Sequence, residues 1–181
     1  MLLSHLRDEA ADVLTVHQEL APLCAEKGIA QEMLWARPVY GWALFATGDE
    51  RRGLDEVAAG LEDQEGSHNM LLRPYYLQLQ AELLLRAGDL DAATERLEAA
   101  QAVGRSTDQH MFAAEWHRLR GEILLARATT NVDDVQAAFD NALEVARWQG
   151  ARLFEQRARA ALAKHAARTR KLSTPPQSTT A

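Results

Sequence analysis

The chain has 181 residues, which predicts one domain or at most two and is enough to bury a hydrophobic core. Alanine (33) and leucine (26) dominate the composition, whereas valine and isoleucine together number ten, and glycine and proline fifteen. This bias excludes most sheet folds and a disordered or collagen-like chain, because strands favour β-branched residues while alanine and leucine are strong helix formers. The formal charge is −6. The composition therefore predicts an all-α protein.

Spacing of the apolar residues predicts eight helices joined by short links. They cover residues 3–27, 30–47, 49–64, 69–87, 89–104, 107–127, 132–149 and 151–170. Short links make neighbouring helices antiparallel. Residues 172–181 carry no charge and no periodicity, so we expect a disordered tail after a single helical domain at 1–171.

A period of 40 residues relates three parts of the chain. Residues 40–49 align with 80–89 and then with 120–128. Each copy has a small residue three positions before a leucine, and the first two copies end in Gly-Asp, which suits a helix end followed by the N-cap of the next helix. The small residues are Gly41, Ala81 and Gly121, and the leucines are Leu44, Leu84 and Leu124.

The second helices of the three copies also correspond, once a two-residue insertion is allowed in the third. The matching positions are Gly53, Val57 and Gly60, then Ala93, Leu97 and Ala100, then Val135, Phe139 and Ala142. A small residue at the first and last positions and a large one between them predict two helices that pack closely at their ends, with one bulky side chain filling the space between them.

Helix pairs with small residues at fixed places and a Gly-Asp turn resemble tetratricopeptide (TPR) repeats of a longer, 40-residue kind. The stretches 71–77, 115–125 and 138–151 are similar to the C-terminal TPR region of large bacterial signalling proteins. In those proteins a class III adenylate/guanylate cyclase or a transcription-factor domain precedes an ATPase module, and the repeats follow. The resemblance covers the repeats alone, most closely at 70–168. It implies a right-handed α-superhelix of three hairpins with a flanking helix at each end.

The resemblance also implies that the first helix of each pair lines a concave face that holds a partner. Counting in steps of three and four residues selects the candidate partner-binding residues Trp35, Trp42, Tyr75, Gln78, Glu82, Arg86, Glu115, Arg118 and Glu122. Aromatic anchors beside polar positions suit the capture of a peptide or helix. In the alternative interpretation, Trp35, Trp42 and Phe45 pack against the N-terminal helix as core.

No catalytic, cofactor or metal site is expected from the sequence. His110 and His117 are seven positions apart, about 10 Å along a helix, which is too far for one metal ion to bridge comfortably. The repeat already explains the equivalent Glu82 and Glu122, and no P-loop occurs. Cys24 is the single cysteine, and we expect it to be a buried structural thiol in a protein without disulfides.

Charge is unevenly distributed along the chain. Residues 147–171 contain eight lysines or arginines and one acid, Glu155, a balance of +7, so the rest of the chain has −13. The simplest interpretation is a solvated last helix with cations toward its C-terminal end. Contact with nucleic acid, an acidic partner or a membrane surface is the alternative, although only Trp148 and Phe154 are aromatic there.

These observations lead us to expect a non-catalytic interaction or regulatory module of a bacterial signalling or transcription-regulatory system. No signal peptide or membrane-spanning run is visible, so we expect a cytoplasmic protein. Its partner would be a peptide, a protein domain or a second copy of the chain. The alternatives are a detached C-terminal piece of a cyclase/ATPase-type enzyme, or a fragment of a nucleic-acid-associated regulator that works through its basic last helix.

Overall fold

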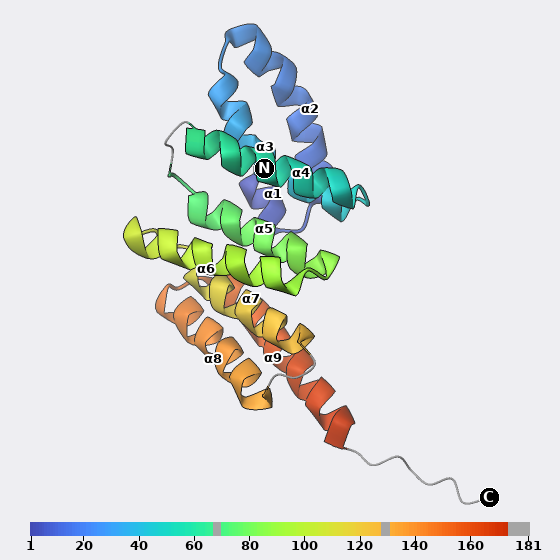
Figure 1. Ribbon diagram of the computed structural model, residues 1–181, viewed down its shortest axis with the longest axis vertical. Helices are drawn as coiled ribbons and strands as arrows, with labels where there is room; N and C mark the ends of the chain where they lie inside the picture. The colour runs from blue at the N-terminus through green and yellow to red at the C-terminus, as the bar shows by residue number, and fades with distance from the viewer. Residues whose placement is uncertain (67–69, 128–130, 174–181) are drawn as a thin grey trace, which may run out of the picture. The chain divides into compact units, whose positions relative to one another are not determined.

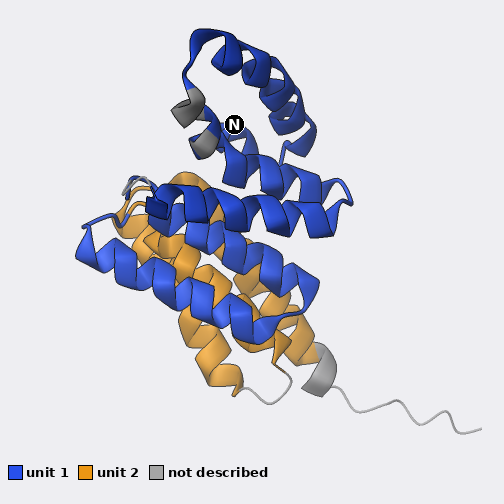
Figure 2. Ribbon diagram, turned by 45° about the horizontal axis from the view of Figure 1, so that its top comes forward, with its two compact units in different colours: residues 1–110 blue, residues 111–181 orange. Residues whose placement is uncertain are grey.

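The computed structural model describes residues 1–66, 70–127 and 131–173 and is all-helical over these ranges, as expected (Figure 1). Its described helices are α1 (Leu2–Leu6), α2 (Ala10–Lys27), α3 (Ala30–Ala46), α4 (Glu50–Gly66), α5 (Arg73–Ala87), α6 (Leu90–Ser106), α7 (Ala113–Ala126), α8 (Val132–Trp148) and α9 (Arg152–Ser173). They form two compact units, unit 1 at residues 1–110 and unit 2 at residues 111–181 (Figure 2). None of the described helices is long and apolar enough to cross a membrane. Residues 174–181 of the expected tail lie outside the described ranges.

The prediction of one first helix over residues 3–27 is wrong, because the helix is interrupted between α1 and α2. Asp8 adopts a left-handed conformation with φ of 59°, and the Glu9 amide donates back to the Ser4 carbonyl at 2.8 Å, which terminates α1. Aspartate tolerates this conformation better than most residues. Buried His5 then anchors the short helix to unit 1.

Two first helices begin later than predicted, α5 at Arg73 and α7 at Ala113. Leu72 and Asp108, with φ of 58° and 55°, interrupt the helical backbone before each start. The side chain of Gln109 accepts from the Leu72 amide at 3.0 Å and donates to the Met70 carbonyl at 2.9 Å. A residue from the segment after α6 thus completes the start of α5.

The predicted Gly-Asp junction is confirmed between α5 and α6. Gly88 has φ of 87°, and the Asp89 carboxylate accepts from the Ala92 amide at 3.1 Å. Glycine satisfies the left-handed end of one helix and aspartate caps the next. The chain can therefore reverse within two residues.

Close packing of α3 on α4 in unit 1 depends on glycines, as the repeat predicts. A Cβ atom on Gly41 would lie 2.6 Å from the Gly53 carbonyl oxygen, and one on Gly53 would lie 2.6 Å from that of Gly41. Gly60 approaches Pro38 as closely, and Val57 is fully buried between these contacts. The two backbones thus touch where side chains are absent, and the valine fills the gap.

The third repeat has the same arrangement inside unit 2. A Cβ on Gly121 of α7 would meet the Phe139 ring of α8 at 2.5 Å, and that ring is 1% exposed. Leu97 occupies the equivalent buried position on α6. The predicted pairs α3–α4, α5–α6 and α7–α8 are all in contact, and α5 also touches α3, as α9 touches both α7 and α8.

Candidate functional site

The nine predicted partner-binding residues lie on three first helices, but the fold treats them differently. Trp35 and Trp42 lie on α3, the four residues from Tyr75 to Arg86 on α5, and the three from Glu115 to Glu122 on α7. The buried members are Trp42, Tyr75, Gln78, Glu82 and Glu115, whereas Trp35 and Arg86 are exposed and Arg118 and Glu122 are partly exposed. The buried side chains are enclosed by the fold and are not available at its surface.

Trp42 belongs to the core of unit 1, as the alternative interpretation predicts. It is 1% exposed and meets the ring of His5 edge-on, with 4.6 Å between ring centroids. His5 Nδ1 also lies 2.7 Å from the Tyr75 hydroxyl in a buried hydrogen bond. Trp42 and Tyr75 therefore contact His5 of α1, and both side chains are buried.

Trp35 differs from the neighbouring tryptophan because its side chain remains 39% exposed. Its carbonyl oxygen accepts a hydrogen bond from the Tyr76 hydroxyl at 2.8 Å. Burial raises the pKa of Tyr76 to about 12. The backbone of α3 is thus tied to α5, while the indole ring of Trp35 remains accessible.

On α5, the predicted polar residues are partly satisfied within the helix. Glu82 pairs with Arg86 one turn later at 2.5 Å. Gln78 is buried, and its Oε1 atom has no hydrogen-bond partner among the described residues. On this part of the predicted face, the charges of Glu82 and Arg86 already pair with each other, and the amide of Gln78 is buried.

In unit 2, Glu115 is the centre of a buried ion network. Its carboxylate contacts the Arg118 guanidinium at 3.0 Å and that of Arg157, on α9, at 3.1 Å. Arg118 continues to Glu122 at 2.6 Å. Two guanidinium groups neutralise a carboxylate that is 1% exposed, so Glu115 and Arg118 join α7 to α9. Sequence reasoning did not find Arg157, because nothing in the repeat indicates which residue of α9 approaches α7.

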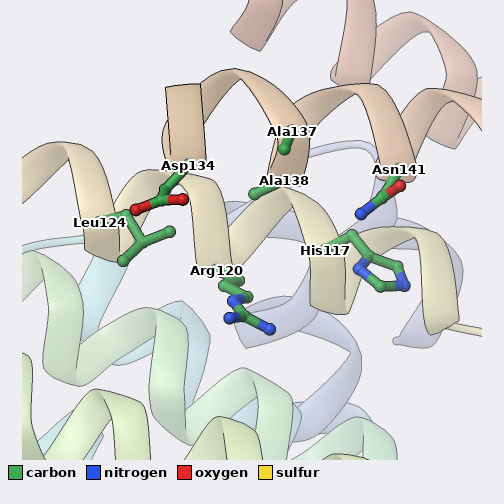
Figure 3. Close-up of a pocket in the computed structure, with 7 residues that line it drawn as sticks. All are labelled: His117, Arg120, Leu124, Asp134, Ala137, Ala138 and Asn141. Carbon is green, nitrogen blue, oxygen red and sulfur yellow. The ribbon is translucent and has the colours of Figure 1, made fainter. Parts of the chain in front are cut away.

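A cleft of about 310 Å³ opens between α7 and α8 in unit 2. It is lined by His117, Arg120, Leu124, Asp134, Ala137, Ala138 and Asn141. Figure 3 shows Asn141 near the His117 ring toward one end of the cleft and Asp134 near Leu124 toward the other. Alanines on α8 leave the space, since a larger side chain at either position would occupy it.

The polar groups of this cleft are not used by the fold. The described residues provide no hydrogen bond or ion pair to the side chains of His117, Arg120, Asp134 or Asn141. Burial, and then the charge of Arg120, lower the pKa of His117 below its ordinary 6.5, so the ring is neutral at pH 7. The cleft thus offers one cation, one anion, an amide and a neutral imidazole, a mixture of donors and acceptors.

Sequence reasoning missed this cleft. His117 and Arg120 are three positions apart on α7, and Asp134 and Asn141 are two turns apart on α8. Their spacing places each pair on one helix face, but only the repeat register could have indicated that the two faces meet. Elsewhere, Cys24 is buried as predicted, and no three potential metal ligands gather among the described residues.

The fold and these sites define an all-helical protein built from antiparallel helix pairs. No protein-family model and no solved structure matches the chain. It is similar to uncharacterized protein R02095 from Rhizobium meliloti (strain 1021), with 41% identity over 86 residues. The match covers 48% of this chain and 8% of that protein, so a segment of this kind occurs within a far longer polypeptide.

Proposed function

We propose that this chain is a non-catalytic interaction or regulatory module of a cytoplasmic bacterial signalling or transcription-regulatory system, and that its helix pairs form a TPR-like superhelix. Equivalent small residues at the α3–α4 and α7–α8 contacts support the repeat. The similar segment inside a much longer bacterial protein supports a module that occurs in different protein contexts. The great length of that bacterial protein also favours a second candidate function, a regulatory piece of a larger signalling enzyme.

The observation that carries the proposal is the α7–α8 cleft. Arg120, Asp134 and Asn141 are available there without breaking any contact of the fold. A peptide backbone presents alternating carbonyl and amide groups, which an amide, a guanidinium and a carboxylate can bind. The Glu115 network, in contrast, has its charges already paired. We therefore place partner binding at the cleft, next to the predicted α7 residues.

Affinity capture with three forms of the protein tests this assignment. The wild type, Arg120→Ala/Asn141→Ala and a control, Arg96→Ala, are each used to capture proteins from a lysate of the source organism. Arg96 is an exposed residue of α6. The proposal expects a protein that the wild type and control retain and the double variant loses. Equal retention by all three would exclude the cleft as the binding site.

A further inference from the structure

The outward face of α9 carries two rows of cations. Phe154, Ala158 and His165 are buried and mark the side that packs within unit 2. Helical periodicity places Arg152 and Arg159 along one edge of the opposite side, and Lys164 and Arg168 along the other edge. All four cations are exposed, and between the rows lie exposed Gln156, Ala160, Ala163 and Ala167, at steps of four, three and four residues. We call these eight residues the α9 outer face.

These cations are largely uncompensated. Within the described part of the chain, Arg152, Lys164 and Arg168 form no ion pair or hydrogen bond through their side chains. Glu155, the one acid between residues 147 and 171, already contacts Arg159 at 2.7 Å and Arg147 at 3.2 Å. The surface therefore presents positive charge on both sides of a narrow strip whose side chains, apart from Gln156, are small alanines.

Unit 1 shows how this protein covers arginines on neighbouring helices. On one edge of α4, Glu56 and Asp63 contact Arg37 of α3 at 2.7 and 2.8 Å. On the other edge, Glu65 contacts Arg73 of α5 at 3.1 Å. A helix with carboxylates along both edges thus fits between helices that carry arginine, while its small residues and Val57 fill the contact.

We propose that the α9 outer face binds an acidic amphipathic helix of a partner protein. The alanines allow a close helix approach, and carboxylates on both edges of the partner would reach Arg152 and Arg159 on one side and Lys164 and Arg168 on the other. Reading of DNA by a helix requires polar side chains that contact base edges, whereas the centre of this face has one glutamine and three alanines. The surface is separate from the α7–α8 cleft, and the proposal does not depend on the proposed function.

A synthetic peptide of residues 50–66 serves as the probe, because it is the acid-edged helix α4, with six acidic and two basic residues. Its fluorescence anisotropy is followed as the full chain is added. Lys164→Glu/Arg168→Glu should weaken binding by about tenfold or more. Arg96→Glu/Arg105→Glu changes the charge equally at exposed positions on α6 and should leave binding nearly unchanged. Circular dichroism checks that both variants fold.

Four results of the binding experiments would overturn the proposal. These are no binding of the peptide, equal binding of a scrambled peptide, equal loss in both charge-reversed variants, or binding of a DNA duplex at this face in place of the peptide. Light scattering tests for self-association. A dimer that the Lys164→Glu/Arg168→Glu substitutions dissociate would assign the α9 outer face to a second copy of the chain and exclude a partner helix. Loss of peptide binding in the α9 variant alone, in a protein that is monomeric, supports the proposal.

Discussion

The carboxylate of Glu115 lies 3.1 Å from the guanidinium of Arg157 and joins α7 to α9 inside unit 2. Because Arg118 binds the same carboxylate, removing it leaves two guanidinium groups without their shared partner. Breaking a buried pair on one side costs about 3–5 kcal/mol, since the remaining charge stays desolvated.

Glu115→Ala should therefore lower the free energy of unfolding by about that amount. Glu122→Ala is the matched control, because the Glu122 carboxylate is more exposed and contacts Arg118 from its outer end. Its loss should cost less than about 1 kcal/mol. Urea denaturation measures both. Equal losses would contradict the central position of Glu115 in the network.

Gly121 provides a second prediction, on packing. A methyl group at this position would lie 2.5 Å from the Phe139 ring, which has no room to move because it is buried. Gly121→Ala should destabilise the protein by about 1–3 kcal/mol despite the better helix propensity of alanine. Thermal and urea unfolding provide the measurement.

Gly66→Ala is the control for this change, since no atom in the described part of the chain lies within 4 Å of the added methyl group. It should cause no loss of stability. Shortening the ring in Gly121→Ala/Phe139→Leu should recover part of the loss through a non-additive effect. Simple additivity would show that the two residues do not share one contact.

A third prediction concerns pH. Burial, with Arg120 as a second cause, lowers the pKa of His117 in the folded state, so the unfolded chain binds the proton first as the pH falls. The stability from neutral His117 is present above pH 6.5 and is lost as the pH decreases through the folded-state pKa. The pKa of His17 is also lowered, chiefly by burial.

Urea midpoints at about pH 7.5 and about pH 5.5 test this effect. His117→Gln should reduce the difference between the two midpoints. An unchanged pH dependence in His117→Gln would show that this ring does not titrate differently in the folded and unfolded states.

The fourth prediction compares two tryptophans of unit 2. Trp148 at the end of α8 is 84% exposed, whereas Trp116 of α7 is 4% exposed. Trp148→Ala should change the free energy of unfolding by less than about 0.5 kcal/mol, and Trp116→Ala should lower it by about 3–5 kcal/mol. Chemical denaturation distinguishes the two. A similar loss in Trp148→Ala would mean that its indole ring is covered in solution.

Much of the fold could be predicted from the sequence, because the 40-residue register is a packing rule. It predicted that the helix pairs pack closely at their small residues, and the structure brings Gly41 against Gly53 and Gly121 against the Phe139 ring. The break at Asp8 was missed because a left-handed aspartate leaves no signal in the apolar spacing.

The candidate site was less predictable. Steps of three and four residues identify a helix face but not the elements that cover it. Tyr75 is covered by His5 of a five-residue helix, and Glu115 by Arg157 of a helix outside the three predicted hairpins. The α7–α8 cleft depends on the space left by Ala137 and Ala138, which appears only once two helices are placed together.

The hydrogen bond between His5 and Tyr75 also has a consequence for the order of folding. It joins residues 70 positions apart, whereas α3 and α4 are consecutive helices joined by a short turn. Contacts between neighbours in sequence close small loops and form quickly, while distant contacts close large loops at a greater entropic cost. Unit 1 should therefore assemble from its helix pairs first, and α1 should dock last, onto the surface that α3 and α5 have already made.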